Sequence, residues 1–430
     1  MPLARVLYSI FVYCCTPLIV LRLLWRALRA PAYAKRWRER WGFVPARPAK
    51  ESLIWLHSVS VGETLAAIPL IKALQTTYPQ THIHVTCMTP TASVQIQTAL
   101  SDYLGRQISH TYAPYDSPSA VARFLRRINP AIFIVMETEL WPNMLASCQA
   151  QSIPVVLANA RLSLKSASGY AQFLTLTKPM LSGLCRVAAQ TPADAARFIA
   201  LGSPTRAVTV TGNIKFDLAL SAELIAKAAV LRGHWQGKVG RPIWLVASTH
   251  PGEEALLLTA FKAVKRAIPN VLMVLTPRHP ERFNAVFKQS VSAGYRVVRA
   301  SDGVAPSAQS DVLVGDTMGQ LLLYYGACDV AFVGGSLVPV GGHNMIEPAA
   351  WGRPIICGPQ LHNFMQVATL LEKAGGLQIC DDVDQLSATV IDVLGSEEKR
   401  LQIGSAALQV AQENRGALQK ILTIIDGVPF

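Results

Sequence analysis

The chain has few charged residues for its length and no recognisable set of metal-binding cysteines. Only 16% of its 430 residues are charged and 51% are hydrophobic, which excludes an intrinsically disordered protein. The eight cysteines include no Cys-x-x-Cys pair and no Cys/His cluster with zinc spacing, so we expect reduced, buried cysteines. No stripe of interleaved basic and aromatic residues crosses the globular part, which argues against a nucleic-acid-binding protein.

The positive charge is concentrated close to the N-terminus. The formal net charge is +13, and residues 22–50 alone contain nine Lys/Arg and one Glu. This segment follows the uncharged run Val6–Leu21, and a basic segment beside an apolar one favours contact with anionic lipid headgroups. An interfacial collar is predicted from interleaved tryptophans and arginines: Trp25, Trp37 and Trp41 with Arg36, Arg38 and Arg40.

The apolar run predicts a single uncleaved N-terminal membrane anchor. As a helix it reaches roughly 24 Å, short of the roughly 30 Å hydrocarbon core, so spanning and monotopic placements both stay open. A signal peptide cleaved near Ala32-Tyr33-Ala34 is disfavoured, because Arg22, Arg26 and Arg29 lie between the run and that site. The positive-inside rule predicts an inner-membrane location with the globular body on the cytoplasmic face.

Beyond residue 50, short apolar runs alternate with helical patterns such as Gly62–Thr77 and Thr91–Leu100. Near-continuous apolar runs are typical of buried parallel strands, and the alternation indicates βαβ units. The predicted strands are Leu53–His57, His82–Cys87, Ala131–Met136, Pro154–Ala158, Ile243–Ser248, Val271–Thr276, Val312–Val314, Val330–Val333 and Pro354–Cys357. We predict an α/β chain of two doubly wound domains, divided near 218–240, whose last thirty residues form one or two helices.

Two acidic segments follow predicted strands of the first domain. Glu63 opens a helix after the loop Ser58–Gly62, where it is either a general base or only a helix-capping residue. Glu137 and Glu139 directly follow another strand, and two carboxylates at a strand end are costly to bury without a role. Ligands of open α/β sheets bind at the carboxyl ends of strands, so both segments are candidate catalytic sites.

Basic and glycine-rich segments provide candidate anion sites. Lys215 follows a Gly-Asn turn and is either a cation in the site or an exposed linker lysine. Arg278 sits between two prolines on a stiff loop suited to a phosphate, whereas the neighbouring His279 alone is more often structural. The turns Gly334-Gly335-Ser336 and Gly341-Gly342-His343-Asn344 precede a helix predicted to start near Met345, whose free N–H groups suit phosphate, while Glu347 suits ribose hydroxyls.

Together these segments resemble the Kdo transferases, which add 3-deoxy-D-manno-octulosonic acid to lipid A precursors. The resemblance covers nearly the whole chain and rests also on Ala158–Ser163, Gln190-Thr191-Pro192, Ala247–His250 and Gly315–Gly319. It implies a GT-B glycosyltransferase with two Rossmann-like domains facing a cleft. The implied division is an anchor and collar at 1–45, an acceptor-binding domain at 46–220, and a CMP-sugar-binding domain with C-terminal helices at 221–430.

The resemblance also implies roles for individual residues. Glu63 matches the family's proposed catalytic base, and Glu137 and Lys215 match residues with transition-state roles. The implied nucleotide contacts are Pro277, Arg278, Met318, Gly319, Gln320, Asn344, Met345, Ile346 and Glu347. Gln320 departs from the glutamate that many relatives carry, which puts donor affinity in doubt if that carboxylate matters.

The implied reaction is an inverting transfer of Kdo from CMP-Kdo to a lipid A precursor, lipid IVA. No cofactor or metal is expected, because Arg278 and Lys215 supply positive charge for the leaving phosphate, although Asp316 and Glu347 could still meet in space. The expected partners are CMP-Kdo, the lipid A precursor and inner-membrane lipids, with no nucleic acid. A UDP-sugar transferase, a sugar-nucleotide epimerase and a non-catalytic membrane sugar-binding protein are the alternatives.

Overall fold

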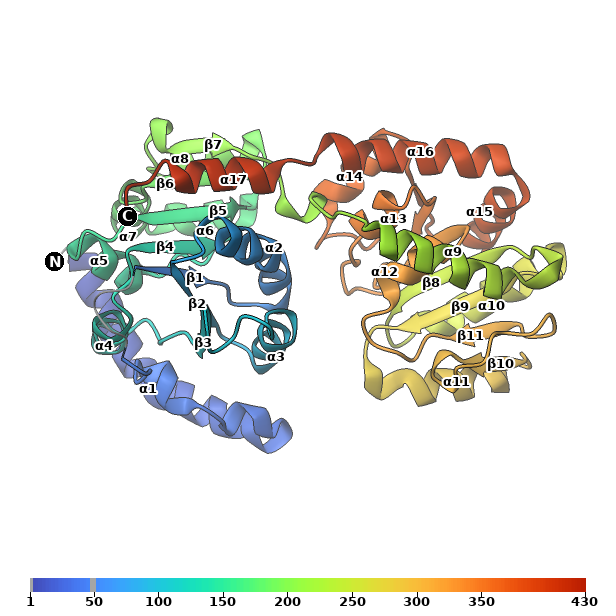
Figure 1. Cartoon of the computed structure of the whole chain (residues 1–430), viewed down its shortest axis with the longest axis horizontal. Helices are drawn as coiled ribbons and strands as arrows, with labels where there is room; N and C mark the ends of the chain where they lie inside the picture. The colour runs from blue at the N-terminus through green and yellow to red at the C-terminus, as the bar shows by residue number, and fades with distance from the viewer. Residues whose placement is uncertain (1–2, 47–51) are drawn as a thin grey trace. The chain divides into compact units, whose positions relative to one another are not determined.

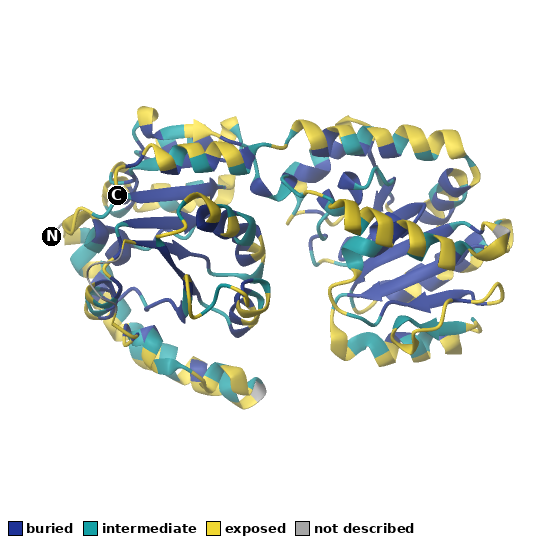
Figure 2. Cartoon of the chain, in the orientation of Figure 1, coloured by how far each residue is buried: buried dark blue, intermediate teal, exposed yellow. Residues whose placement is uncertain are grey.

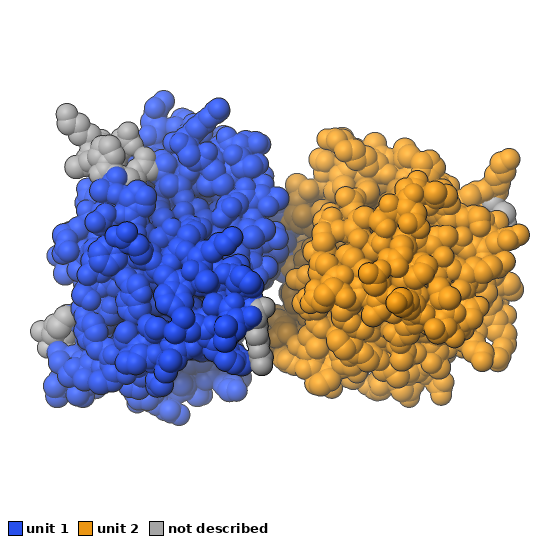
Figure 3. Space-filling model, turned by 90° about the horizontal axis from the view of Figure 1, so that it is seen from below, with its two compact units in different colours: residues 1–217, 415–430 blue, residues 218–414 orange. Residues whose placement is uncertain are grey.

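The computed structural model describes residues 3–46 and 52–430 and divides the chain into two compact units (Figure 3). Unit 1 comprises Met1–Asp217 together with Arg415–Phe430, and unit 2 comprises Leu218–Asn414. Each unit is built around one parallel sheet of seven strands with helices on its faces (Figure 1). This confirms the prediction of two doubly wound α/β domains.

The sheet of unit 1 has the strand order β3-β2-β1-β4-β5-β6-β7. Its strands are β1 Leu53–His57, β2 His82–Cys87, β3 Ile108–Tyr112, β4 Ile132–Met136, β5 Val155–Ala160, β6 Arg186–Ala189 and β7 Val208–Val210. Its α-helices are α1 Leu3–Arg29, α2 Val61–Thr77, α3 Pro90–Ala99, α4 Pro118–Ile128, α5 Pro142–Ala150, α6 Leu164–Gln172, α7 Leu174–Ser182, α8 Pro192–Ala200 and α17 Ala417–Asp426. Short 3-10 turns are η1 Pro31–Ala34, η2 Trp37–Trp41, η3 Thr205–Ala207 and η4 Ile214–Phe216.

The sheet of unit 2 has the strand order β10-β11-β9-β8-β12-β13-β14. Its strands are β8 Ile243–Thr249, β9 Leu272–Pro277, β10 Val297–Arg299, β11 Val312–Val314, β12 Val330–Val333, β13 Ile355–Cys357 and β14 Leu377–Ile379. Its α-helices are α9 Ala222–Gln236, α10 Glu253–Ala267, α11 Phe283–Ser292, α12 Leu321–Ala327, α13 Ile346–Ala350, α14 Met365–Lys373, α15 Val383–Gly395 and α16 Glu397–Glu413. Short 3-10 turns are η5 Gly237–Val239, η6 Pro280–Arg282 and η7 Ala300–Asp302.

The central strands are buried on both faces, as their sequences predicted. Every residue of β1, β4, β8 and β12 is buried, and these strands appear dark blue in Figure 2. The nine predicted strands correspond to observed ones within a few residues. The sequence analysis missed β3, β6, β7, β10 and β14, which are short or lie toward sheet edges. Partly exposed strands such as β10 carry polar residues and so lack a continuous apolar run.

The final helix belongs to unit 1, although the sequence placed it in a C-terminal domain beginning at residue 221. Ile421 and Ile425 of α17 are fully buried in the core that contains α2 and the strands of unit 1. The carboxylate of Asp217, at the end of the first pass through unit 1, accepts hydrogen bonds from the backbone N–H groups of Gly416 and Leu418. These contacts attach the returning chain at the point where the first pass leaves the unit. The last thirty residues do contain two helices, as expected.

The N-terminal helix α1 is longer than the uncharged run that predicted it. By length and composition Leu3–Leu28 is apolar enough to cross a membrane, with a mean hydropathy of 1.9. The hydroxyl of Ser9 donates to Asn143 Oδ1 (3.0 Å) and the hydroxyl of Tyr13 donates to Ser119 Oγ (3.0 Å), so α1 also contacts α5 and α4. Its remaining surface exposes large apolar side chains, among them Leu3, Leu7, Phe11, Leu18, Leu21 and Leu28.

Part of the predicted collar is built into unit 1 instead of facing a membrane. The side chain of Arg40 is 2% exposed, lies over the ring of Tyr112 at 4.1 Å and donates to the carbonyl of Met88 (3.0 Å). Arg36 forms an ion pair with Glu39 (2.8 Å). The collar prediction is therefore wrong for these two arginines, because their side chains contact acidic, aromatic and backbone groups of unit 1. The basic residues at positions 47 and 50 lie outside the described residues.

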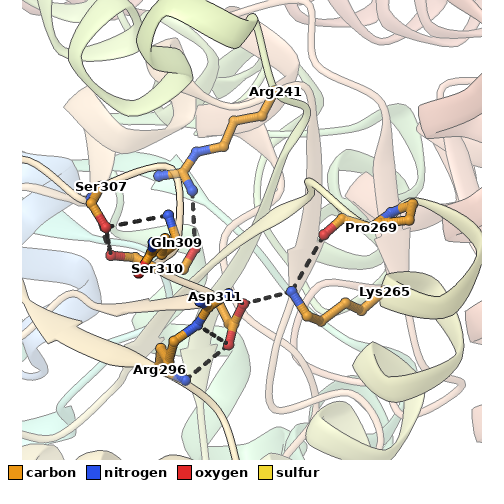
Figure 4. Close-up of polar contacts among 8 residues, drawn as sticks. All are labelled: Arg241, Lys265, Pro269, Arg296, Ser307, Gln309, Ser310 and Asp311. Carbon is orange, nitrogen blue, oxygen red and sulfur yellow. Dashed lines mark hydrogen bonds and ion pairs between the residues drawn. The ribbon is translucent and has the colours of Figure 1, made fainter.

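A charged network connects the segments at the amino end of the second sheet. This end is opposite to the carboxyl ends of the strands, where ligands are expected to bind. The Asp311 carboxylate, just before β11, accepts from Lys265 Nζ (2.5 Å) and from the backbone N–H of Arg296 (2.9 Å), as Figure 4 shows. Arg241, just before β8, donates to the carbonyl of Ser310 (2.9 Å). These residues connect the segments that enter β8, β10 and β11, so their role is structural.

Candidate functional site

The strand order of unit 1 brings two acidic segments to adjacent strand ends. β1 pairs with β2 on one side and with β4 on the other, so the strand order reverses between β1 and β4. The loop that leads to Glu63 follows β1, and Glu137 and Glu139 follow β4. In open parallel sheets a ligand binds outside the carboxyl ends of the strands at such a reversal. Both acidic segments therefore lie where the fold favours a binding site.

The carboxylate of Glu63 is held by the loop that caps α2. Its two oxygens accept hydrogen bonds from the backbone N–H of Val59 and from Ser60 Oγ, each at 2.7 Å. Ser60 Oγ in turn accepts from the N–H of Glu63 (3.3 Å), as in a capping box. Burial raises the pKa of Glu63, hydrogen bonds from Ser60 and Val59 oppose this rise, and the charge of Glu137 adds to it. The capping interpretation and the general-base interpretation thus describe the same fixed carboxylate.

Glu137 and Lys215 form an ion pair across the site. Lys215 Nζ lies 3.0 Å from Glu137 Oε1, and both side chains are partly exposed. The backbone of Glu137 is left-handed (φ 55°), which is uncommon for a residue other than glycine and is concentrated at functional sites. Asn159, fully buried at the end of β5, accepts from the N–H of Ile214 (3.0 Å) and so positions the short η4 turn that carries Lys215. Lys215 is therefore part of the acidic cluster and not an exposed linker lysine.

Glu139 is a third carboxyl in this cluster. Burial raises the pKa of Glu139 to about 7, and the charge of Glu63 adds to the rise. The indole N–H of Trp141 donates to Glu139 Oε2 (3.1 Å) and partly offsets it. Because the sequence shows only two glutamates two residues apart, it does not reveal which of them is paired and which is desolvated. In the structure Lys215 is paired with Glu137, whereas burial raises the pKa of Glu139 to about 7.

In unit 2 the same topological reversal lies between β8 and β12. Pro277 ends β9, next to β8, and the N–H of Arg278 donates to the carbonyl of Thr249 (3.0 Å). Among the residues that the structure describes, the Arg278 guanidinium forms no hydrogen bond or ion pair, and its charge opposes the burial that raises the pKa of Glu347. Arg278 thus supplies a cation without a bonded partner at the carboxyl edge of this sheet.

The first glycine turn differs from the predicted phosphate cradle. The buried carboxylate of Glu253 accepts the N–H groups of Gly335 (2.7 Å), Ser336 (2.9 Å) and Leu337 (2.9 Å). The N–H groups of the second turn, Gly341 and Gly342, both donate to the carbonyl of Gly335. These turn N–H groups are therefore not free for a phosphate, because an internal carboxylate and a carbonyl already accept them.

The helix after these turns is short and starts close to the predicted position. α13 comprises only the five residues Ile346–Ala350, with Met345 as its cap residue. Asn344 Oδ1 accepts from the N–H of Ile346, and Asn344 Nδ2 donates to Glu347 Oε1, each at 3.0 Å. Burial raises the pKa of Glu347, and these contacts with Asn344 and the charge of Arg278 oppose the rise. Asn344 and Glu347 therefore form a preassembled pair of polar side chains beside Arg278.

The segment Met318-Gly319-Gln320 follows β11 at the same edge of the sheet. Gly319 has a left-handed backbone (φ 79°), Gln320 caps α12, and the side chain of Met318 is largely exposed. Asp316 does not approach Glu347, since its carboxylate accepts from the N–H and the hydroxyl of Ser301 at 2.9 and 2.6 Å. The sequence alone left open whether the carboxylates of Asp316 and Glu347 lie close together.

Comparison with known proteins identifies the family. The model of the family described as 3-Deoxy-D-manno-octulosonic-acid transferase (kdotransferase) matches residues 35–218. A 3-deoxy-D-manno-octulosonic acid transferase of Haemophilus influenzae is 40% identical over 98% of this chain and 98% of its own length. A Bordetella pertussis protein of the same name is 37% identical over 94% of this chain and 95% of its own length. The chain belongs to the Kdo transferase family of glycosyltransferases.

Solved structures agree with the GT-B fold of this Kdo transferase. The UDP-GlcNAc 2-epimerase of Neisseria meningitidis superposes with a TM-score of 0.59 at 13% identity, covering 88% of this chain and 100% of the epimerase. A glycosyltransferase from Rickettsia africae gives a TM-score of 0.56 at 14% identity, with 88% and 100% coverage. At such low identity these likenesses establish the shared fold alone. An epimerase with the same fold also shows why the fold cannot by itself decide the reaction.

The carboxylates of Asp382, Glu253 and Glu254, which belong to acidic pairs of this Kdo transferase, make other contacts. Asp382-Val383-Asp384 has an Asp-x-Asp spacing that the sequence analysis overlooked, but Asp382 caps α15 by accepting from the N–H of Gln385 (2.8 Å). The adjacent Glu253 and Glu254 bind the glycine turn and Arg282, respectively. Within residues 3–46 and 52–430, no group of three or more His, Cys, Asp or Glu side chains is arranged to hold a metal ion.

Proposed function

We propose that this Kdo transferase moves Kdo from CMP-Kdo to a lipid A precursor, lipid IVA, with inversion at the anomeric carbon. The observation that carries the proposal is the Glu63 carboxylate, fixed beside the Glu137–Lys215 ion pair at the carboxyl edge of the first sheet. Family membership supports Kdo as the transferred sugar. The donor nucleotide, the acceptor and the stereochemistry are our proposal.

In the proposed reaction Glu63 accepts the proton of the acceptor hydroxyl as its oxygen attacks the anomeric carbon. The bond between that carbon and the phosphate oxygen of CMP breaks in the same step, so CMP leaves with the electron pair and the configuration inverts. A buried carboxylate with a raised pKa suits this role, since general bases work best when their pKa approaches the working pH. The charge of Lys215, next to Glu137, would stabilise the anionic transition state.

The leaving phosphate needs positive charge from the protein in this proposal. Arg278 is the available cation of unit 2, and Asn344 with Glu347 presents polar groups for a nucleoside beside it. We further propose that α1 holds the enzyme at the cytoplasmic face of the inner membrane, where a lipid acceptor is within reach. The apolar length of Leu3–Leu28 and the large apolar side chains exposed on α1 support this placement.

Mass spectrometry of the product tests the proposal directly. Purified enzyme is incubated with lipid IVA and CMP-Kdo, and with lipid IVA and a UDP-sugar as the matched alternative donor. We expect lipid IVA to gain the mass of one or more Kdo residues only with CMP-Kdo, and the anomeric configuration read by NMR to be opposite to that of the donor. Transfer from the UDP-sugar alone would replace the proposed donor, and retained configuration would refute the single displacement.

A further inference from the structure

Two histidines of unit 2 face each other at its topological reversal. His250 follows β8, and His343 lies in the loop after β12, the two strands between which the order reverses. Their Nε2 atoms are 2.8 Å apart, and their rings are nearly parallel, with centroids 5.0 Å apart and an interplanar angle of 11°. This distance requires one ring nitrogen to donate and the other to accept, so a neutral pair shares a single hydrogen. The sequence analysis did not assign a role to either residue.

The charges around this histidine pair are predominantly positive. His279 lies against His250 with ring centroids 5.3 Å apart, and Arg278, Arg282 and His279 all disfavour a further proton on His250. Arg282 is itself neutralised by Glu254, which it meets at 2.8 Å. Glu253 favours protonation of His250, but its oxygens are hydrogen-bonded to backbone N–H groups. The unneutralised charge that faces the pair is that of Arg278.

The backbone of the glycine turns cannot replace these side chains as an anion site. The N–H groups of Gly335, Ser336 and Leu337 donate to Glu253, and those of Gly341 and Gly342 donate to the carbonyl of Gly335. These five N–H groups are therefore not free for a phosphate, which makes the side chains at this edge the donors of interest. Around the reversal between β8 and β12, the side chains with N–H donors for a phosphate include Arg278 and the imidazoles.

We propose that His250 and His343, together with Arg278, bind the phosphate of the donor nucleotide, and that the pair takes up a proton when the phosphate binds. The identity of that nucleotide as CMP rests on the proposed function, whereas the phosphate site rests on the geometry of the pair. In the protonated pair each ring has one N–H outside the shared hydrogen bond, so both rings are able to donate to the anion. The neutral pair has only one such N–H.

The pKa shifts of the two histidines in the free protein agree with proton uptake on binding. Burial lowers the pKa of His343 to about 4, and the positive charges of His250, Arg278 and His279 add to this. Burial likewise lowers the pKa of His250. Both imidazoles are therefore neutral near pH 7 in the free protein. The phosphate dianion of bound CMP favours the charged form and raises the pKa of the pair, so affinity for CMP should fall as pH rises through that higher pKa.

Calorimetry of the full-length protein in detergent tests this inference. CMP and cytidine are each titrated at pH 7 in two buffers with different ionisation enthalpies, which reports the protons taken up. We expect uptake approaching about one proton per CMP and none for cytidine, which lacks the phosphate. A phosphate monoester bound by arginine alone would release protons instead, because its own second pKa of about 6 would fall.

His343→Gln is the decisive variant, because its amide preserves hydrogen bonding but cannot accept the proton. We expect it to abolish proton uptake and to weaken CMP binding roughly 10- to 100-fold, while cytidine binding stays unchanged. His234→Gln, on the exposed surface of α9, is the matched control and should bind CMP as the wild type does. If His343→Gln does not fold, His250→Gln provides the same test from the other ring.

The outcomes separate this inference from the proposed function. Wild-type binding of CMP without proton uptake, or equal uptake in His343→Gln, would overturn the histidine phosphate site and leave the proposed reaction intact. Binding of UDP but not CMP would overturn the proposed donor. In that case, uptake with UDP that disappears in His343→Gln would still support the phosphate site, and its absence would overturn the site as well.

Discussion

At the residue scale, Glu63 connects the stability of a helix with the proposed chemistry. Its carboxylate accepts two hydrogen bonds from the loop that starts α2, and the same contacts fix its position near Glu137. A base held in this way loses little entropy when the acceptor hydroxyl arrives. Capping and catalysis therefore depend on different properties of one side chain, namely its hydrogen-bond acceptors and its ability to gain a proton.

Glu63→Gln separates these two properties. The amide still accepts one hydrogen bond but cannot take up a proton, so turnover should fall roughly 10²- to 10⁴-fold while CMP affinity is unchanged. Initial rates and CMP calorimetry provide the measurement. Ser60→Ala is the comparison, because it removes the cap at a cost of about 1 kcal/mol and one of the two hydrogen bonds to the carboxylate, but keeps a group that can gain a proton. If Glu63→Gln retained more than a tenth of wild-type turnover, Glu63 would be a capping residue only.

Glu137 should set part of the pH dependence of the reaction. Its charge adds to the burial that raises the pKa of Glu63, whereas Glu139 has a pKa raised to about 7 and is largely protonated at lower pH. A base with a raised pKa loses activity as pH falls through that pKa, so the acid limb of the kcat/KM profile should lie above pH 4.5. Glu137→Gln should move this limb to lower pH, and Glu139→Gln should leave it in place. A limb that moved with Glu139→Gln and not with Glu137→Gln would show that Glu139 is the charge that repels the base.

Asp311 offers a test of stability that is independent of catalysis. Burial alone would raise the pKa of Asp311, but hydrogen bonds from Lys265 and Arg296 outweigh it and leave the pKa below its ordinary value. Because the folded-state pKa is depressed, the stabilisation is present above the unfolded pKa and is lost as pH falls through the folded one. Asp311→Asn should cost about 2 kcal/mol at pH 7, measured by urea unfolding, and less at low pH.

Asp392 provides the control for this experiment. Its ion pair with Lys399 is about half exposed on both sides, so solvent screens it and Asp392→Asn should change the free energy of unfolding very little. An equal loss in both variants would mean that burial of the Asp311 network contributes nothing specific.

At the element scale, the predicted anchor and collar at 1–45 comprises two segments that contact the rest of unit 1 differently. Residues 36–44 carry the buried Arg40 and Val44, and Arg123 donates to the carbonyl of Trp41. α1 instead contributes polar contacts through Ser9 and Tyr13 and exposes most of its large apolar side chains. We therefore expect removal of the helix to disturb the fold of unit 1 less than removal of the segment that follows it.

Two truncations distinguish these segments. Removal of residues 1–30 should release the protein from inner-membrane vesicles and leave turnover on detergent-dispersed acceptor largely intact. Removal of residues 1–41 should in addition lower the melting temperature, because it leaves Tyr112 without Arg40 and exposes the core beneath it. Vesicle sedimentation and thermal unfolding measure the two effects. A protein lacking residues 1–30 that still sediments with vesicles would indicate a second lipid-binding surface.

At the scale of the whole molecule, the proposed reaction uses charges that the protein itself supplies. The guanidinium of Arg278 has no hydrogen-bond or ion-pair partner among the described residues, Lys215 is paired with Glu137, and each cation lies at the carboxyl edge of its own sheet. This distribution suits a donor with a phosphate and a carboxylate, since each unit can meet negative charge without a metal ion.

Turnover should consequently persist in excess EDTA at close to its untreated rate. The measurement is the initial rate of Kdo transfer after exhaustive chelation, with and without added Mg²⁺ or Mn²⁺. The same protein with Arg278→Ala serves as the control for loss of phosphate charge and should lose CMP affinity in either condition. Activity that disappears with EDTA and returns with a divalent ion would refute the proposed metal independence.

The sequence by itself determined the local pattern of strands and helices. Apolar runs such as Ile132–Met136 specify buried strands wherever they lie, and parallel pairing brings their carboxyl ends to one edge, so Glu63 and Glu137 were predictable as neighbours. Short strands near the edges, β10 among them, were missed because partly exposed strands need no apolar run.

Only the tertiary structure decided which groups meet across long separations. Glu253 occupies the N–H groups of a glycine turn 82 residues later, His250 pairs with a histidine 93 residues away, and α17 returns to the first unit. No local periodicity encodes such contacts, because they depend on the order of strands within a sheet. The candidate acids were therefore visible in the sequence, whereas their charge states and the phosphate site follow from how the strands are arranged.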